Sequence, residues 1–437
     1  MAVAGIGISN RPLIDFLLER GAHVTARDKK ERGTLGEIAG ELEARGVRLI
    51  CGEGYLDGID EEYIFRTPGL RYDTPQIAEA VKKGSVLTSE MELFFELSPT
   101  KIIGITGSDG KTTTTNIIYR MLSRAGRRVF VGGNIGAPLL PELSDMTQND
   151  IAVVELSSFQ LHTMRRSCHC AVITNLSPNH LDYHTDMNEY IEAKTNIFIH
   201  PQNKRLVLNK NCPVTRQLEP LARADSEIIF FNDENGVHEK NKTIYFKNEP
   251  LFDTADILIP GRHNAENYMA AAAAVYGLAN PDDMREIART FGGAEHRNEF
   301  VRELRGVRYY NSSIDSSPSR TKTALYSYDR KVILILGGKD KNIPFDSLRI
   351  PVKECAKRVI LTGQTGPALK KILENREDDP MPPSDLYPNF DDAVIAAAAA
   401  AEDGDIVLLS PAGTSFDAFT NFEERGNRFK TLINNLT

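Results

Sequence analysis

The stretch Lys101-Ile102-Ile103-Gly104-Ile105-Thr106-Gly107-Ser108-Asp109-Gly110-Lys111-Thr112-Thr113 decides the fold of this 437-residue chain. It starts with a β-branched run typical of a buried strand, continues into a glycine-rich turn, and then opens a helix. Glycines at a helix N-terminus let backbone N–H groups surround phosphate oxygens, where the helix dipole adds partial positive charge. The stretch therefore predicts a phosphate-binding loop between a strand and a helix.

Two side chains of this loop have a clear chemical use. Lys111 can reach the terminal phosphates of a nucleotide, and the hydroxyl of Thr112 can ligate Mg²⁺. The usual spacing of such loops requires a glycine at the position of Ile105, whereas here the glycine stands one place earlier, at Gly104. We interpret the loop as a variant of the motif rather than a chance glycine-rich turn, because a strand precedes it and a helix follows it.

Composition limits the kinds of partner. Apolar residues make up 41% of the chain and charged residues 26%, which is ordinary for a globular protein. The net charge of −8 argues against nucleic acid as the main partner, because a phosphate backbone requires clustered Lys and Arg. The five scattered cysteines favour reduced thiols and a cytoplasmic location. We expect neither a signal peptide nor membrane insertion, since there is no basic leader and no long apolar run.

A nucleotide-binding βαβ unit is predicted at the start of the chain. Ala2–Ser9 has the pattern of a strand end, a glycine turn and a helix start, and the next strand, His23–Ala26, leads to Asp28, near the place of a ribose. Its third glycine is missing, so the fingerprint alone does not identify a dinucleotide. Thr67-Pro68-Gly69 follows a later strand, and Leu97-Ser98-Pro99 marks a domain boundary.

Two polar side chains follow buried strands in the next part of the chain. Glu155 ends an apolar strand, and a buried unpaired carboxylate is costly, so we expect a cation beside it. We favour Mg²⁺ over a structural arginine, because the phosphate loop already requires the metal. His180 follows the strand Ala171–Asn175, at an edge where open α/β sheets bind ligands, although a loop histidine is more often a surface residue.

A helix expected over Met187–Ile199 carries Lys194 on its apolar face, four residues from both Tyr190 and Phe198. Desolvation there would lower the pKa of the amine and make it reactive. The amine could pair with a carboxylate, snorkel to solvent, or react with CO₂ to form a carbamate that can ligate a metal. From the residues alone, snorkelling is favoured.

An alanine-rich helix is predicted to run through Ala274, with Asn264 as its N-cap. Asn267 lies three residues later and faces the same way. Its amide can pair with the N6/N7 edge of adenine. Capping explains Asn264 fully but leaves Asn267 without a role.

The triplet Cys168-His169-Cys170 has the residue types of a metal site. It runs into an apolar strand, and no second pair of ligands lies nearby. We therefore expect a buried strand start rather than a zinc site.

The last part of the chain alternates strands with helices after a linker that carries His296-Arg297. This alternation predicts a parallel sheet with crossover helices. Three polar loops follow its strands: Asn311–Ser316, Gly337–Lys341 and Ser410–Ser415. The loops would converge at one edge of the sheet, and Lys341 with the nearby hydroxyls suits a ligand that bears a carboxylate.

These motifs together resemble those of the Mur ligase family over nearly the whole chain. The shared pattern comprises Gly104–Thr113, Glu155-Leu-Ser-Ser, Asn175-x-x-x-x-His180-Leu181-Asp182, Lys194, His263-Asn264-x-x-Asn267 and His296-Arg297. Each motif is modest alone, but their order and spacing are specific. Glu155–Leu161, the Gly337-Gly338 loop and Leu409–Gly426 are similar to the D-glutamate-adding members of the family.

The resemblance implies an α/β fold with three domains: a Rossmann-like domain for a UDP-sugar (residues 1–97), a central P-loop-type ATPase domain with a mostly parallel sheet (98–295), and a Rossmann-like amino-acid domain (296–437). It implies a ligase with UDP-N-acetylmuramoyl-L-alanine, D-glutamate and ATP as substrates, which acts through an acyl phosphate in cytoplasmic peptidoglycan precursor synthesis. The cofactors implied are two Mg²⁺ ions and a carbamylated Lys194. We expect a monomer.

The resemblance also assigns residues to sites. Lys111, Lys194 and His180 are the implied catalytic residues, and the implied metal ligands are Thr112, Glu155, His180 and Lys194. The implied ATP-binding residues are Gly107, Ser108, Asp109, Gly110, Lys111, Thr112, Thr113, Asn267 and Arg297. The implied UDP-sugar-binding residues are Ile8, Ser9, Asp28, Lys29, Thr67 and Asn134. The implied amino-acid-binding residues are Ser316, Lys341, Ser415 and Phe422.

Three positions depart from the family pattern: Asn179 and Ser312 stand where aspartate is usual, and Ile314 stands where many relatives carry lysine. Asn179, Ser312 and the short first strand leave open a nucleotide-binding homologue with weak catalysis and a regulatory or scaffolding role. A sister ligase and folylpolyglutamate synthase are disfavoured by the stretch from Ser410 to Phe422. Hydride transfer at Gly5-x-Gly7 is disfavoured as well, because nothing else in the chain supplies that chemistry.

Overall fold

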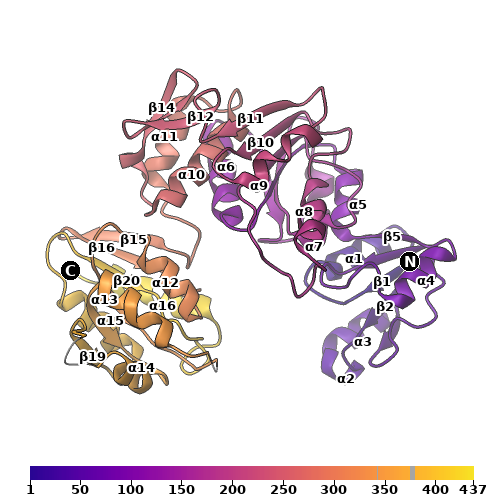
Figure 1. Cartoon of the computed structure of the whole chain (residues 1–437). Helices are drawn as coiled ribbons and strands as arrows, with labels where there is room; N and C mark the ends of the chain where they lie inside the picture. The colour runs from indigo at the N-terminus through magenta and orange to yellow at the C-terminus, as the bar shows by residue number, and fades with distance from the viewer. Residues whose placement is uncertain (342, 375–378) are drawn as a thin grey trace. The chain divides into compact units, whose positions relative to one another are not determined.

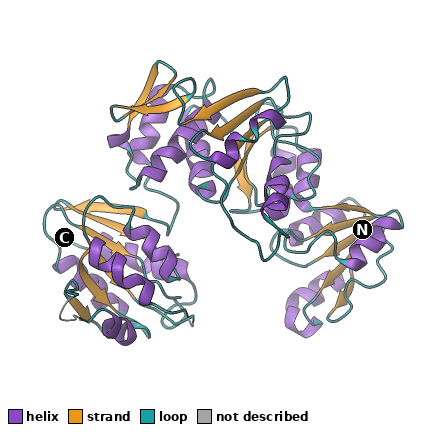
Figure 2. Cartoon of the chain, in the orientation of Figure 1, coloured by secondary structure: helices purple, strands orange, loops and turns teal. Residues whose placement is uncertain are grey.

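In the computed structural model, which describes residues 1–341, 343–374 and 379–437, the phosphate-loop stretch forms strand β6 (Lys101–Thr106), a short loop and helix α6 (Lys111–Arg124), as the sequence predicts (Figure 1). The strands form sheets of five, nine and six members, and Figure 2 distinguishes them from the helices. This is the three-domain α/β architecture expected. Contacts divide the chain into two units: Met1–Phe252 with Glu266–Ile287, and Asp253–Ala265 with Ala288–Thr437.

Strand β6 lies inside the nine-stranded sheet of the first unit. Its neighbours β8 (Ile151–Glu155) and β9 (Cys170–Ile173) run parallel to it, so the carboxyl ends of all three strands share one edge. The full order is β14-β13-β12-β11-β10-β9-β6-β8-β7. The other strands are β7 (Val129–Gly133), β10 (Arg205–Asn209), β11 (Glu227–Phe231), β12 (Val237–Lys240), β13 (Thr243–Phe246) and β14 (Glu249–Asp253).

Gly104, the displaced glycine of the phosphate-loop motif, is a packing residue of β6 rather than a loop residue. A Cβ at this position would lie 2.0 Å from Sγ of Cys168. Cys168 is fully buried, and the N–H of Ile102 donates to Nδ1 of His169, 3.0 Å away. The triplet that contains Cys168 therefore packs on β6 at the start of a buried strand, as the sequence predicts.

The five-stranded sheet of the first unit has the order β3-β2-β1-β4-β5 and is parallel throughout. Its strands are β1 (Ala2–Ala4), β2 (Thr25–Asp28), β3 (Arg48–Cys51), β4 (Tyr63–Arg66) and β5 (Val86–Thr88). The strand predicted at His23–Ala26 is therefore shifted by two residues. The associated helices are α1 (Asn10–Glu19), α2 (Arg32–Leu35), α3 (Glu37–Ala44), α4 (Pro75–Lys82) and α5 (Glu90–Leu97). One apolar cluster joins this sheet to the central one, because it contains both Leu13 and Leu140.

Two helix predictions need correction. Helix α8 spans Met187–Thr195 and does not reach Ile199. Beyond it, the carbonyls of Asn196 and Ile197 accept hydrogen bonds from Oγ of Ser167 and N–H of Cys168, so the chain turns away from helical geometry. Helix α10 spans Arg262–Val275, so Asn264 lies inside it and the predicted N-cap is wrong. Nδ2 of Asn264 donates to the carbonyl of Pro260 instead, at 2.6 Å.

The second unit holds the six-stranded sheet, in the order β15-β16-β20-β17-β18-β19. The strands are β15 (Glu299–Leu304), β16 (Val307–Asn311), β17 (Val332–Leu336), β18 (Ala356–Leu361), β19 (Ser384–Leu386) and β20 (Ile406–Leu409). Only β15 is antiparallel to its neighbour. The helices include α12 (Pro318–Leu325), α13 (Arg349–Cys355), α14 (Gly366–Ile372), α15 (Phe390–Ala399) and α16 (Phe422–Asn434). Within the described ranges, no helix is long and apolar enough to cross a bilayer.

The tight contact at Gly104 gives a test of the packing. Gly104→Ala is expected to destabilise the protein by about 1–3 kcal/mol, because the added methyl group overlaps the thiol of Cys168. The double variant Gly104→Ala/Cys168→Ala is expected to be more stable than Gly104→Ala. Thermal unfolding followed by circular dichroism measures both.

Gly40→Ala serves as the control, because a Cβ there meets no atom within 4 Å. It is expected to leave stability unchanged or slightly raised, since alanine favours a helix. Equal stability of Gly104→Ala and the parent protein would contradict the packing.

Candidate active site

The phosphate loop is held closed by its own lysine. Nζ of Lys111 donates to the carbonyls of Gly107 (3.0 Å) and Ser108 (2.9 Å). Gly107 and Gly110 have φ of 146° and 79°, values that favour glycine. Oγ of Ser108 shares a hydrogen bond of 2.9 Å with the hydroxyl of Tyr190 on α8. The loop thus has a closed conformation, and a hydrogen bond to α8 stabilises it.

Glu155 lies at the end of β8, beside the start of α6. It is 2% exposed, its Oε2 accepts from Oγ1 of Thr112 (2.8 Å), and its Oε1 accepts from Nδ2 of Asn134 (2.9 Å). Both oxygens of Glu155 thus accept from neutral groups, a hydroxyl and an amide, which favours the metal over a structural arginine. A carboxylate beside a hydroxyl offers the oxygen donors that Mg²⁺ prefers, so Thr112 and Glu155 fit this metal.

Lys194 projects from α8 toward the phosphate loop and is 1% exposed. Its Nζ donates to Oγ1 of Thr106 (2.9 Å) and to the carbonyl of Gly107 (3.1 Å), and lies 4.8 Å from the centre of the Tyr190 ring. Burial holds the pKa of the amine well below its ordinary value, Lys111 adds to this effect, and Glu155 opposes it. Snorkelling, which the sequence alone favoured, is therefore wrong, and no carboxylate among the described residues forms an ion pair with Lys194.

His180 lies in the loop between β9 and α8, with a positive φ of 55°. Its ring packs edge-on against Phe159, with centres 4.9 Å apart. Partial burial lowers its pKa, the charge of Lys111 lowers it further, and the charge of Asp182 opposes them. This direction favours the neutral imidazole, which is the form that ligates metals.

Asn267, on α10, packs against the end of the phosphate loop. Its Oδ1 accepts from Oγ1 of Thr114 (3.3 Å), and a Cβ at Gly110 would lie 2.3 Å from the same oxygen. Arg297 belongs to the second unit and follows His296, whose Nδ1 accepts from Nδ2 of Asn311 (2.9 Å). Asn267 is thus placed at the loop, and Arg297 is placed on the other unit.

Five of the six residues assigned to the UDP-sugar lie at the carboxyl edge of the five-stranded sheet. Asp28 ends β2, and its carboxylate accepts from the N–H groups of Ile6 (2.7 Å) and Lys30 (2.9 Å). The other four residues at this edge are Ile8, Ser9, Lys29 and Thr67. The sixth residue, Asn134, follows β7 and binds Glu155 instead.

The polar loops of the second unit converge at one edge of its sheet, as the sequence predicts. The N–H groups of Ser312, Gly337 and Lys339 donate to the carbonyls of Leu409, Pro411 and Thr414, each at 2.8 Å. Of the residues assigned to the amino acid, Lys341 donates to Oγ of Ser316 (3.1 Å) and Ser415 is 2% exposed. Phe422 opens α16, with its ring 5.9 Å from that of His296.

Arg425 was not assigned from the sequence. It is 2% exposed and donates to Oγ and the carbonyl of Ser313 and to the carbonyls of Gly413 and Thr414, at 2.8–3.2 Å. Burial lowers its pKa to about 10. It ties the loop after β16 to the loop after β20, beside Ser415. Its position in the first turn of a helix after an Asn N-cap gave no signal that its side chain points inward.

Comparisons with known proteins identify the family of this chain. Residues 105–275 match the Mur ligase middle domain, and residues 296–413 match the glutamate ligase domain of Mur ligases. A protein of Acetivibrio thermocellus named UDP-N-acetylmuramoylalanine–D-glutamate ligase is 46% identical over 450 residues, which cover 100% of this chain and 96% of the relative. A protein of Clostridium botulinum (strain 657) with the same name is 47% identical over 442 residues, with the same coverage.

Solved structures support the fold. That of a UDP-N-acetylmuramoyl-L-alanyl-D-glutamate–2,6-diaminopimelate ligase has a TM-score of 0.61 and 18% identity, and it covers 91% of this chain and 89% of that one. The sequence relatives extend over the full length of the chain, and the middle-domain match includes the phosphate loop from Thr106 to Thr113. The chain therefore belongs to the Mur ligase family.

Proposed function

We propose that this protein is an ATP-dependent ligase that adds D-glutamate to UDP-N-acetylmuramoyl-L-alanine in peptidoglycan precursor synthesis. The observation that carries the proposal is the buried amine of Lys194, which lies beside a formed phosphate loop and the Thr112–Glu155 pair. The names of the full-length relatives supply the acceptor and the amino acid.

The reaction has two steps. An oxygen of the alanine carboxylate attacks the γ-phosphorus of ATP, the bond to ADP breaks, and an acyl phosphate forms. The amine of D-glutamate then attacks the acyl carbon, phosphate leaves through a tetrahedral intermediate, and the nitrogen loses a proton to give the amide. The reactants are anionic, so the first step requires close alignment and charge neutralisation.

The residues of the phosphate loop take distinct parts in the first step. Lys111 and the backbone N–H groups at the start of α6 bind the β- and γ-phosphates. Thr112 and Glu155 would hold one Mg²⁺, which neutralises phosphate charge when bound. Asn134 donates to the second oxygen of Glu155 and so orients the carboxylate.

A second Mg²⁺ would be held by His180 and a carbamylated Lys194. As an amine, Lys194 does not fit a cation site, whereas a carbamate offers oxygen ligands. Its neutral nitrogen would attack the carbon of CO₂ and lose a proton. Burial lowers the pKa of the amine and so favours the neutral form that this reaction requires.

The three domains take separate substrates in this proposal. Residues 1–97 bind the UDP-sugar through Ile8, Ser9, Asp28, Lys29 and Thr67, with Asn134 nearby on the central domain. Residues 98–295 bind ATP, with Asn267 at the adenine. Residues 296–437 bind D-glutamate through Ser316, Lys341, Ser415 and Phe422, and Arg297 reaches the nucleotide. The protein acts in the cytoplasm, in agreement with its five free cysteines, and we infer that it acts as a monomer.

Phosphate release tests the reaction. With ATP, Mg²⁺ and UDP-N-acetylmuramoyl-L-alanine, release is expected with D-glutamate and not with L-glutamate, L-lysine or meso-diaminopimelate. Lys111→Ala is expected to abolish it. Release that needs no sugar nucleotide, or that prefers another amino acid, would contradict the proposal. ATP binding without release would favour the weakly catalytic homologue and make Asn179→Asp and Ser312→Asp the first reversions.

Loss of the amine tests the role of Lys194. Lys194→Ala is expected to lower kcat by roughly 10³-fold, about 4 kcal/mol of barrier, because an oxygen ligand of the metal is lost. Acetate is expected to restore part of the rate by supplying a carboxylate. Lys204→Ala, at an exposed lysine paired with Asp225, serves as a control that acetate should not affect. Normal activity of Lys194→Ala would overturn the assignment.

A further inference from the structure

Arg71, in the loop after β4, uses every donor of its guanidinium, and three of its five hydrogen bonds reach the segment around α8. Nε and Nη2 donate to the two carboxylate oxygens of Asp73 (2.8 and 2.7 Å). Nη2 and Nη1 also donate to the two oxygens of Glu189 (2.9 and 3.2 Å), and Nη1 donates to the carbonyl of Tyr183. These contacts use all five N–H groups that a guanidinium has.

The partners of Arg71 belong to segments that carry the proposed chemistry. Arg71 itself lies four residues after Thr67, in the loop that follows β4. Glu189 is in the first turn of α8, the helix that carries Lys194, and Tyr183 is three residues after His180. One side chain therefore links the sugar-nucleotide loop to both segments assigned to the second metal.

Arg66, the last residue of β4, makes a parallel connection. It is fully buried, and its Nη2 donates to the carbonyl of Phe159 (2.8 Å) and to Oγ1 of Thr163 (3.1 Å). Its Nη1 donates to the carbonyls of Pro68 and Leu70, at 3.1 and 3.0 Å. The loop after β4 is thus fixed at both ends, by Arg66 and by Arg71.

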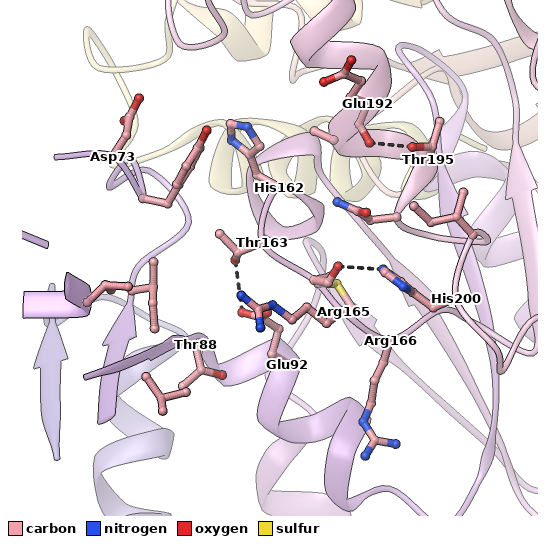
Figure 3. A pocket seen from close by; sticks show the side chains of 18 of the residues that line it. Asp73, Thr88, Glu92, His162, Thr163, Arg165, Arg166, Glu192, Thr195 and His200 are labelled. Atoms are coloured by element: carbon pink, nitrogen blue, oxygen red, sulfur yellow. Dashed lines mark hydrogen bonds between the residues drawn. The ribbon is translucent and has the colours of Figure 1, made fainter. Parts of the chain in front are cut away.

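A cavity of about 1110 Å³ lies beside this link (Figure 3). Its lining comes from both parts of the first unit, including Asp73 and Thr88 on one side and His162, Glu189 and Thr195 on the other. Residues 72–96 and residues 162–200 face each other across this cavity instead of packing together. The hydrogen bonds of Arg71 beside the cavity therefore have more influence on how these two segments are aligned.

Glu189 also belongs to a cluster of three side chains with the spacing of a metal site. The ligand atoms of His162, His184 and Glu189 lie within 4.8 Å of one another. Both oxygens of Glu189 already accept from the guanidinium of Arg71. A divalent cation would lie next to this fixed positive charge. The positive charge that pairs with the Glu189 carboxylate is therefore the guanidinium of Arg71.

We propose that Arg71 is a positioning residue that aligns the sugar-nucleotide loop with the segments carrying His180 and Lys194. This inference rests on the proposed function, in which a carboxylate held by the first domain must attack a phosphate held by the central domain. Misplacement by about 1 Å can cost about 10²-fold in such a reaction. Loss of the link therefore lowers the rate of reaction in the ternary complex more than it weakens the binding of either substrate.

Arg71→Lys tests the inference, because lysine keeps the charge but has only three donors on one atom. We expect kcat to fall roughly 10- to 100-fold, while the Kd values for ATP and for UDP-N-acetylmuramoyl-L-alanine, measured by calorimetry, change less than about threefold. Glu189→Gln is expected to lower kcat by a similar factor. The kcat of the double variant Arg71→Lys/Glu189→Gln is expected to be no lower than that of the poorer single variant, because both substitutions remove the same interaction. Arg308→Lys is the matched control, since Arg308 pairs with Glu303 within a single hairpin.

The proposal would be overturned by a kcat of Arg71→Lys equal to that of the parent protein. It would also be overturned if the fall in kcat came with an equal weakening of the binding of both substrates and a lower Tm. Hydrogen exchange at the amides of residues 183–195 provides a readout independent of activity. Faster exchange in Arg71→Lys supports the link even if the parent protein shows no D-glutamate-dependent turnover, a result that counts against the proposed function alone. Unchanged exchange together with unchanged kcat rejects the link.

Discussion

A buried amine beside a second amine is the constraint on which the rest of the site depends. Lys194 is 1% exposed, and its partners among the residues that the structure describes are a hydroxyl and a carbonyl at the end of β6, with no carboxylate. A charged ammonium in this place is costly, and Lys111 on the same loop raises that cost. The arrangement therefore favours the neutral amine, the form from which the proposed carbamate would be made.

The sheet topology explains why these groups meet. Parallel strands place their carboxyl ends at one edge, so Thr106, Glu155 and the segment leading to His180 are adjacent although they are far apart in the sequence. Helix α8 then returns over this edge, where Tyr190 bonds to Ser108 and Lys194 to Gly107. The phosphate loop and the groups proposed to bind metal are therefore parts of one packed structure.

The sequence predicted the features that depend on local pattern. The β6–loop–α6 unit, the buried strand after Cys168 and the converging loops of the second unit are all confirmed, because strand periodicity and loop composition determine them. The end of α8 was wrong because Ser167 and Cys168, some thirty residues earlier, bind the carbonyls of Asn196 and Ile197. The cap at Asn264 was wrong because the helix starts two residues earlier, at Arg262.

Long-range polar contacts were beyond the reach of sequence patterns. Arg425 and Arg71 each bind groups from distant segments, and nothing in their own neighbourhoods distinguishes them from surface arginines. The role of Gly104 was also hidden, because the thiol that excludes a side chain there comes from Cys168 on a different segment. The assigned substrate residues remain proposals that rest on family resemblance and on their placement at the sheet edges.

The chemical state of Lys194 tests the account most directly. Carbon-13 NMR of the protein equilibrated with ¹³C-bicarbonate is the measurement, with Lys194→Ala as the reference. The account predicts a carbamate carbon resonance in the parent protein that is missing from the variant. Identical spectra for the two proteins at saturating bicarbonate would contradict the account and leave the second metal without its ligand.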